Sequence, residues 1–143
     1  MCGICGVFNL SENNGNYESK VRIALTNMVH RGPDSFGLYN DRQITLGHCR
    51  LAILDLSNNG AQPFLNRNKT TIVVFNGEIY NYKEIRNLLK EKKYEFKSNT
   101  DTEVLVHGYD EWGLDEMLKK VKGMFSLAIF DKTTNTMVIA KDP

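Results

Sequence analysis

The feature that most limits how this chain can fold is a set of strand-like runs that are apolar on both faces. Residues 70–75 are β-branched, end in an aromatic residue and are nearly uncharged, which is typical of a buried strand. Residues 125–130 and 137–140 are apolar runs joined by the polar segment 131–135, which predicts an antiparallel hairpin. A strand with two apolar faces needs cover on both sides. We therefore expect an α+β fold with layered antiparallel sheet between helices.

Other elements follow from local signals. Helical spacing predicts a helix before Arg31 from Val21, Ala24, Leu25 and Met28. Asn81 can cap a second helix, and Thr100 with Glu103 fits a capping box for a third, followed by a short helix over 114–121. Strand-like residues cover 44–53, and the polar segment 11–15 predicts a loop. Asn76-Gly77 ends the strand at 70–75 and, taken alone, is a strong hairpin-turn signal.

Length and charge exclude several functional classes. The chain has 143 residues, which fits one domain with one core. Its net charge of +1 gives no electrostatic argument for nucleic acid or for an anionic membrane. No apolar run reaches the roughly 18 residues that span a bilayer, and no secretion signal is indicated. We expect a cytoplasmic protein.

The cysteines Cys2, Cys5 and Cys49 do not predict a disulfide framework, because their number is odd and the chain is not expected to be secreted. Structural zinc normally needs four ligands, and no second close pair accompanies Cys2 and Cys5. We expect no metal, and a redox pair stays a distant alternative.

Cys2 has a chemical alternative to burial as a small residue. Removal of Met1 would leave an N-terminal cysteine with a free α-amine beside its thiol. Reference pKa values are about 7.7–8.0 for the amine and about 8.5 for the thiol, so both titrate near neutral pH. The amine can take the thiol proton and later return it to a leaving group, which makes Cys2 a candidate nucleophile.

Motifs around Cys2 resemble those of a known family. The run 1–8 resembles the start of class II, N-terminal-nucleophile glutamine amidotransferases. The family's further motifs follow in its order and approximate spacing: Arg31-Gly32-Pro33-Asp34, His48-Cys49-Arg50-Leu51-Ala52-Ile53, Phe75-Asn76-Gly77-Glu78-Ile79-Tyr80-Asn81 and Thr100-Asp101-Thr102-Glu103. Asp55-Leu56-Ser57 and Gln62-Pro63 look most like the glutamine-hydrolysing asparagine synthetase branch.

The resemblance implies a four-layered αββα sandwich of antiparallel sheets for residues 1–143. It also implies that this glutaminase domain is incomplete at its C-terminal end, because the family's domain continues past this point into further strands. The family's synthetase domain, with its pyrophosphate loop, has no match in this chain. No cofactor is therefore expected here, and ATP and magnesium belong to that missing domain.

The resemblance also implies roles for individual residues. Arg50 would bind the α-carboxylate of glutamine and Asp101 its α-ammonium, with assistance from Glu78. Asn76 and Gly77 would hold the oxyanion that forms when Cys2 attacks the side-chain amide. Structural alternatives are a surface ion pair for the arginine and helix-dipole compensation for the aspartate.

The resemblance further implies that Leu51 and Ile53 pack near the substrate and contact it through their backbone. His30 and His48 are expected to be structural. The predicted reaction converts glutamine to glutamate and ammonia through a γ-glutamyl thioester. The predicted partner is an ammonia-accepting synthetase domain in cis, and a homo-oligomer is left open. Alternatives are an inactive glutamine-binding or regulatory module, the glutaminase part of another amidotransferase branch, and an amidohydrolase for another amide.

Overall fold

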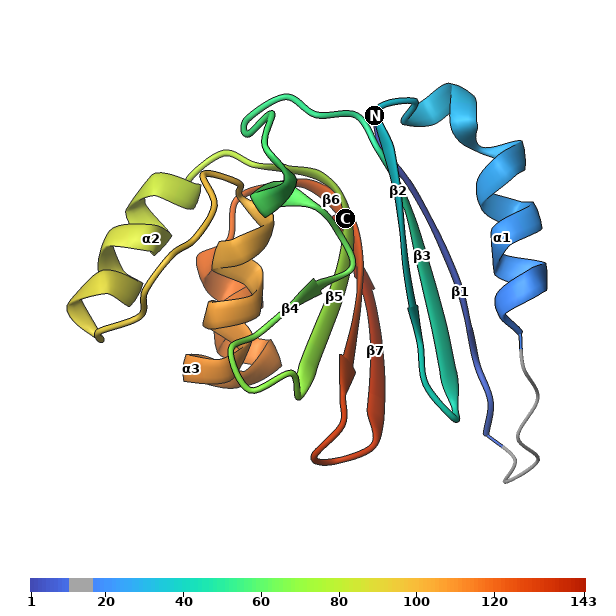
Figure 1. The fold of residues 1–143 in the computed structure, drawn as a ribbon. Helices are drawn as coiled ribbons and strands as arrows, with labels where there is room; N and C mark the ends of the chain where they lie inside the picture. Colours follow the sequence, from blue (N-terminus) through green and yellow to red (C-terminus); the bar gives the residue numbers. More distant parts are fainter. Residues whose placement is uncertain (11–16) are drawn as a thin grey trace.

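A computed structural model describes residues 1–10 and 17–143 of the chain, so the loop predicted at 11–15 lies outside the described residues. The elements form four layers, in which two sheets face each other (Figure 1). One helix covers the outer face of the first sheet, and two helices cover the outer face of the second. The outer helix on one side is α1 (Glu18–Asn27). Helices α2 (Tyr82–Glu91) and α3 (Thr102–Lys120) lie on the other.

The sheet beside α1 is three-stranded and antiparallel, in the order β1-β3-β2. Its strands are β1 (Gly3–Phe8), β2 (Ser35–Asn40) and β3 (Ile44–Arg50). Every residue of β3 is buried, because this central strand has α1 on one face and the second sheet on the other. The register pairs Gly3 with Cys49 and Ile4 with His48.

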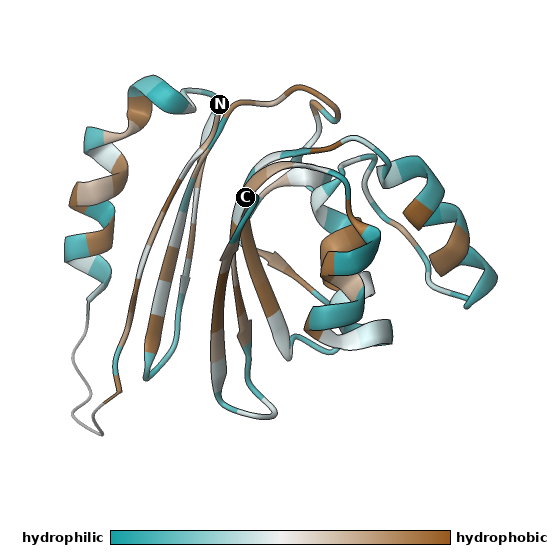
Figure 2. Ribbon diagram, turned by 180° about the vertical axis from the view of Figure 1, so that it is seen from behind, coloured by the Kyte–Doolittle hydropathy of each residue, from teal (hydrophilic) through white to brown (hydrophobic). Residues whose placement is uncertain are grey.

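The second sheet is four-stranded and antiparallel, in the order β4-β5-β6-β7. Its strands are β4 (Phe64–Leu65), β5 (Thr71–Ile79), β6 (Gly123–Asp131) and β7 (Thr136–Lys141). Hydrophobic residues concentrate along its central strands (Figure 2). Alternate residues of β5 face opposite layers: Ile72 and Val74 pack against the first sheet, whereas Val73 and Phe75 pack under α2 and α3.

The αββα architecture and the hairpin predicted at 125–140 are therefore confirmed. The strand end predicted at Asn76-Gly77 is wrong, because both residues continue β5 opposite Ser126 and Phe125 of β6. Pairing along nine residues of β5 overrides the local turn preference of the dipeptide. The strand predicted at 44–53 ends earlier, at Arg50.

The two predicted helix caps are met only in part. Asn81 is the N-cap residue of α2, as predicted, but its side chain makes no cap bond and instead donates to the Lys120 carbonyl and accepts from the Lys122 amide, at 2.8 and 2.9 Å. The N-cap of α3 is Asp101 rather than Thr100, and the Glu103 carboxylate accepts from the Ser98 amide. The short helix expected at 114–121 is the part of α3 after a kink at Gly113 (φ 72°).

We expect His48 to make the protein sensitive to acid. Burial between the sheets lowers the pKa of His48 from 6.5 to about 4. Between these pH values the unfolded chain binds more protons than the folded one, so the free energy of unfolding falls as the pH falls from 6.5 to 4. At about 1.36 kcal/mol per pKa unit, the loss is about 3 kcal/mol. Urea unfolding across this range should show a flatter pH dependence for His48→Gln.

The matched control for this experiment is His30→Gln, because His30 is an exposed histidine. Its unfolding free energy should keep the acid sensitivity of the parent protein. An unchanged pH dependence in His48→Gln would contradict the assignment of that sensitivity to His48.

Candidate active site

All the side chains predicted for the site line one cavity of about 180 Å³. They come from segments far apart in the sequence: Cys2, Arg50, Leu51, Ile53, Asn76, Gly77, Glu78 and Asp101. The lining also includes residues that were not predicted for the site, among them Asp55, Gly60, Gln62, Thr100 and Thr102. Met1 lines the cavity too, so the initiator residue lies against the side chains that the prediction groups together.

Cys2 is held at the start of β1 by main-chain contacts. Its Sγ accepts from the Leu51 amide at 3.4 Å and lies 3.7 Å from the Leu51 carbonyl oxygen. The Arg31 Nε donates to the Cys2 carbonyl at 3.0 Å. The antiparallel pairing of β1 with β3 begins with Gly3 opposite Cys49, so Cys2 and Arg50 directly follow the last paired residues at the same end of the sheet. Both residues line the cavity.

Arg50 is buried and fixed by the loop that follows β3. Its Nη1 donates to the Ser57 carbonyl at 2.7 Å, and its Nη2 donates to the Asp55 carbonyl. A Cβ at position 60 would collide with Nη2, so Gly60 leaves space for the guanidinium. Arginine carries five N–H donors, so donors remain for a carboxylate in the cavity.

The loop around Arg50 is itself tied down by Asp55. The Asp55 carboxylate accepts from the Ser57 amide and hydroxyl at 2.8 and 2.6 Å, and from the Asn99 amide at 2.8 Å. The Ser57 hydroxyl and these two amides lower the pKa of Asp55 to about 2. The carboxylate therefore links the loop after β3 to the segment before α3.

Asn76 and Gly77 present different groups near the cavity. Among the described residues the Asn76 Oδ1 is a buried atom without a hydrogen-bond partner, and Asn76 lines the cavity. Gly77 has φ +156°, and a Cβ there would collide with the Met124 carbonyl and with Phe125. The close approach of β5 to β6 at this point requires glycine.

Asp101 joins the start of α3 to the end of β5. Its Oδ2 accepts from the Ile79 amide at 2.9 Å, and only 6% of the residue is exposed. Burial raises the pKa of the Asp101 carboxyl, while the Ile79 amide acts in the opposite direction. Glu78 is exposed, and Ile53 is 72% exposed at the edge of the cavity, so the two residues lie at its mouth.

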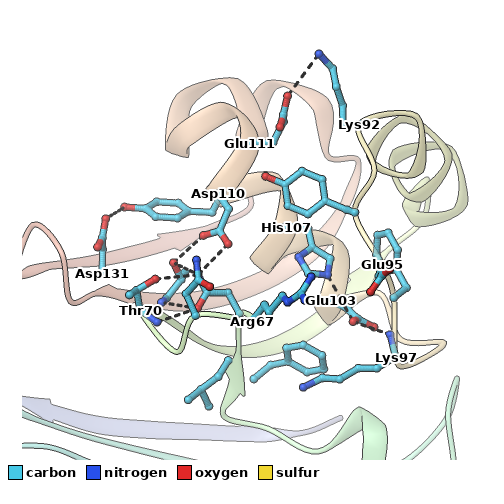
Figure 3. Close-up of a pocket in the computed structure, with 18 of the residues that line it drawn as sticks. Arg67, Thr70, Lys92, Glu95, Lys97, Glu103, His107, Asp110, Glu111 and Asp131 are labelled. Atoms are coloured by element: carbon cyan, nitrogen blue, oxygen red, sulfur yellow. Dashed lines mark hydrogen bonds and ion pairs between the residues drawn. The ribbon is translucent and has the colours of Figure 1, made fainter.

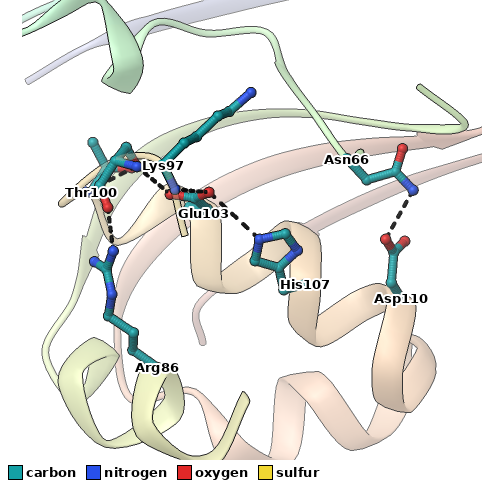
Figure 4. Close-up of polar contacts among 8 residues, drawn as sticks. Asn66, Arg86, Lys97, Thr100, Glu103, His107 and Asp110 are labelled. Carbon is teal, nitrogen blue, oxygen red and sulfur yellow. Dashed lines mark hydrogen bonds and ion pairs between the residues drawn. The ribbon is translucent and has the colours of Figure 1, made fainter. Parts of the chain in front are cut away.

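A larger depression of about 1180 Å³ lies beside α3, and none of the residues predicted for the site lines it (Figure 3). Its polar groups bind one another: Asn66 donates to Asp110 at 2.9 Å, and Glu103 accepts from the Lys97 amide at 2.9 Å (Figure 4). The ring of His107 lies between two aromatic rings. The residues predicted for the site meet at the smaller cavity and not here, so the smaller cavity is the candidate active site.

In the described part of the chain, no group of three or more His, Cys, Asp or Glu residues is arranged to hold a metal ion. Across residues 1–10 and 17–143, no helix combines the length and the apolar character needed to cross a membrane.

The two facing sheets with outer helices, and a cysteine cavity at one end, define an amidotransferase-type αββα sandwich. A solved structure of glutamine phosphoribosylpyrophosphate amidotransferase from B. subtilis shares the fold, with a TM-score of 0.77 over 98% of this chain and 37% of that one, at 21% identity. The model of the glutamine amidotransferase domain matches residues 1–143. The chain therefore belongs to the glutamine amidotransferase domain family.

Relatives of similar sequence include the glutamine-hydrolyzing asparagine synthetase 1 of Bacillus subtilis (strain 168), 39% identical over 145 residues. The asparagine synthetase 1 of Arabidopsis thaliana is 39% identical over 142 residues. The alignments include 100% and 99% of this chain but 23% and 24% of those proteins. The chain thus spans about a quarter of the length of these curated relatives.

We expect Gly77→Ala to be more destabilising than Gly113→Ala. Both glycines have positive φ, which costs other residues about 1–3 kcal/mol. At Gly113 nothing in the described residues lies within 4 Å of an added Cβ, so only this strain applies. At Gly77 the Cβ also meets β6 backbone, which adds about 1–3 kcal/mol of overpacking. Urea unfolding measures the difference, and equal losses would contradict the close approach of the strands.

Proposed function

We propose that this domain hydrolyses the side-chain amide of glutamine to glutamate and ammonia, with Cys2 as the nucleophile after removal of Met1. The observation that carries the proposal is the convergence of Cys2, Arg50, Asn76 and Asp101 on one cavity. Met1 is 70% exposed, so it is accessible to an aminopeptidase. Its removal both frees the α-amine and takes the Met1 side chain out of the cavity lining.

In the proposed reaction the α-amine of Cys2 accepts the thiol proton, and the sulfur attacks the amide carbon. The oxyanion that forms receives hydrogen bonds from the Asn76 amide nitrogen and the Gly77 backbone amide. The C–N bond breaks as the ammonium of Cys2 returns its proton to the departing nitrogen, which releases ammonia. Water then attacks the γ-glutamyl thioester, so that glutamate leaves and the thiol is restored.

Arg50 and Asp101 select an amino acid as the substrate. The remaining guanidinium donors of Arg50 suit a bidentate contact with an α-carboxylate. Asp101 offers a carboxylate oxygen to an α-ammonium, and Glu78 adds negative charge at the mouth. Leu51 positions the thiol through its backbone, and Ile53 is the apolar neighbour at the rim. This pairing of opposite charges favours glutamine over a simple amide.

The names of the longer relatives support a role for this chemistry in a larger reaction, because they describe glutamine-hydrolysing asparagine synthetases. We propose that the ammonia passes to a synthetase domain in cis in a cytoplasmic protein, where ATP and magnesium would be used. The residues of this chain supply the ammonia and need no cofactor of their own.

Cys2→Ala should abolish ammonia release from glutamine, because no other group in the cavity can form the thioester. The measurement is ammonia production by the protein with a processed N-terminus, together with its unfolding curve. Cys5→Ala is the matched control: the Cys5 Sγ points to α1, 3.9 Å from the Val21 carbonyl, and the variant should keep its activity. A folded Cys2→Ala protein with parental activity would refute the mechanism, and a parent protein that binds glutamine without releasing ammonia would indicate a regulatory module.

Asn76→Ala should lower kcat about 10²–10³-fold, equivalent to about 2.7–4 kcal/mol of barrier, through loss of one oxyanion donor. The KM for glutamine should change little, since the oxyanion exists only in the transition state. Steady-state kinetics separate the two constants. A rise in KM at constant kcat would assign Asn76 to substrate binding instead.

Arg50→Lys should raise the KM for glutamine, because lysine keeps the charge but lacks the guanidinium fork. The analogue 4-aminobutyramide lacks the α-carboxylate, so the KM for this analogue should be the same in the parent and in Arg50→Lys. A penalty of the same size on both substrates would mean that Arg50 acts only by holding the loop after β3.

A further inference from the structure

Gln62 occupies a position that the proposed reaction does not explain. It lies in the segment between a 3₁₀ turn at Asn58–Gly60 and strand β4, and it is buried against the cavity. Its side-chain amide is satisfied at both ends. The Oε1 accepts from the Phe75 amide at 2.6 Å, and the Nε2 donates to the Thr102 hydroxyl at 3.2 Å.

The contact with Phe75 completes the edge of β5. Strand β4 pairs only with Ile72 and Val73, so the Phe75 amide lies beyond the end of that pairing. A buried amide without an acceptor costs about 1–3 kcal/mol, and the Gln62 oxygen supplies the acceptor. Phe75 directly precedes Asn76, so this bond fixes the backbone that carries the proposed oxyanion donors.

The contact with Thr102 fixes the other side of the site. Thr102 is the first residue of α3 and follows Asp101, whose carboxylate accepts from the Ile79 amide. One side chain therefore joins the strand of the proposed oxyanion donors to the helix of the proposed ammonium ligand.

The main chain of Gln62 is anchored on the opposite sheet. A Cβ at Gly37 of β2 would collide with the Gln62 carbonyl, so strand and loop lie in direct contact. Because its backbone rests on the first sheet and its side chain binds the second, Gln62 resists movement of the two sheets relative to each other at the cavity.

We propose that Gln62 is a positioning residue that sets the spacing between the oxyanion donors and the α-ammonium ligand, an inference that rests on the proposed function. Oxyanion donors act at about 2.7–3.1 Å, and a displacement of about 1 Å can cost roughly 100-fold in rate. Both ends of the Gln62 side-chain amide are engaged by Phe75 and Thr102, so Gln62 acts through the residues that it holds. It determines where both sets of ligands lie.

The experiment compares kcat and KM for glutamine in variants of the protein with a processed N-terminus. Gln62→Leu removes both bonds, so kcat should fall roughly 10–100-fold and KM should rise. Thr102→Val removes only the contact with α3, so KM should rise while kcat stays within about threefold of the parent. Thr102→Ser restores the acceptor and should return KM to the parental value.

Asn66→Ala is the matched control for lost stability. Asn66 is equally buried, 6% exposed against 7% for Gln62, and its side chain accepts from the Thr71 amide elsewhere on β5. The Asn66 side chain binds Asp110, and neither residue lines the candidate active site (Figure 4). This variant should lose stability in urea but keep the parental kcat and KM.

Each outcome decides the inference. A folded Gln62→Leu protein with the kcat and KM of the parent would overturn the inference. An equal fall of kcat in Gln62→Leu and Asn66→Ala would also overturn it, because it would show that the role of Gln62 is purely structural. If Gln62→Leu does not fold, the Thr102 pair decides, and a parental KM in Thr102→Val overturns the inference. A parent protein that releases no ammonia overturns the proposed function, and the positioning role with it. Active parent protein with insensitive variants overturns only the role of Gln62.

Discussion

The antiparallel pairing of β1 with β3 is the constraint on which the cavity depends. The register that sets Gly3 against Cys49 and Ile4 against His48 leaves Cys2 and Arg50 at the same end of the sheet, where both line the cavity. Side chains alternate between faces along a strand, so a slip of one residue would turn Cys2 toward α1. The helix packs Val21 and Leu25 against the other face and makes such a slip costly. Packing of an apolar layer thus fixes the orientation of the thiol.

The cavity then forms where regular pairing stops. β3 ends at Arg50, β4 pairs with only two residues of β5, and α3 begins at Thr102. Backbone groups freed at these ends need partners, and side chains such as Asp55 and Asp101 supply them. The polar side chains at this end of the sandwich therefore also hold the loops in position, and these contacts fix the position of each polar side chain.

The layers of the fold could be predicted because the strand patterns required cover on both faces. Strand β2 was not predicted, since Ser35–Asn40 contains glycine and polar residues and becomes a strand through its pairing with β3. Asn76-Gly77 was predicted to end its strand because the dipeptide favours turns locally, whereas its strand conformation is set by pairing with β6, which lies much later in the sequence. The residues predicted for the site come from motifs of consecutive residues that resemble those of the family. Gln62 was noted only as a mark of the asparagine synthetase branch, and its positioning contacts could not be predicted because its partners are 13 and 40 residues away.

The same contacts that build the site also stabilise this end of the domain, so a loss of activity in a variant does not by itself identify a catalytic role. Arg50 and Asp101 are both buried, and each is satisfied by backbone groups that also anchor a loop or a strand. Removing either partner of such a contact leaves a buried polar group unpaired, which costs stability whatever the chemistry. A catalytic role and a structural role are therefore distinguished by measuring kcat and KM separately, and by using substrates that lack one recognised group. A change in stability alone does not distinguish them.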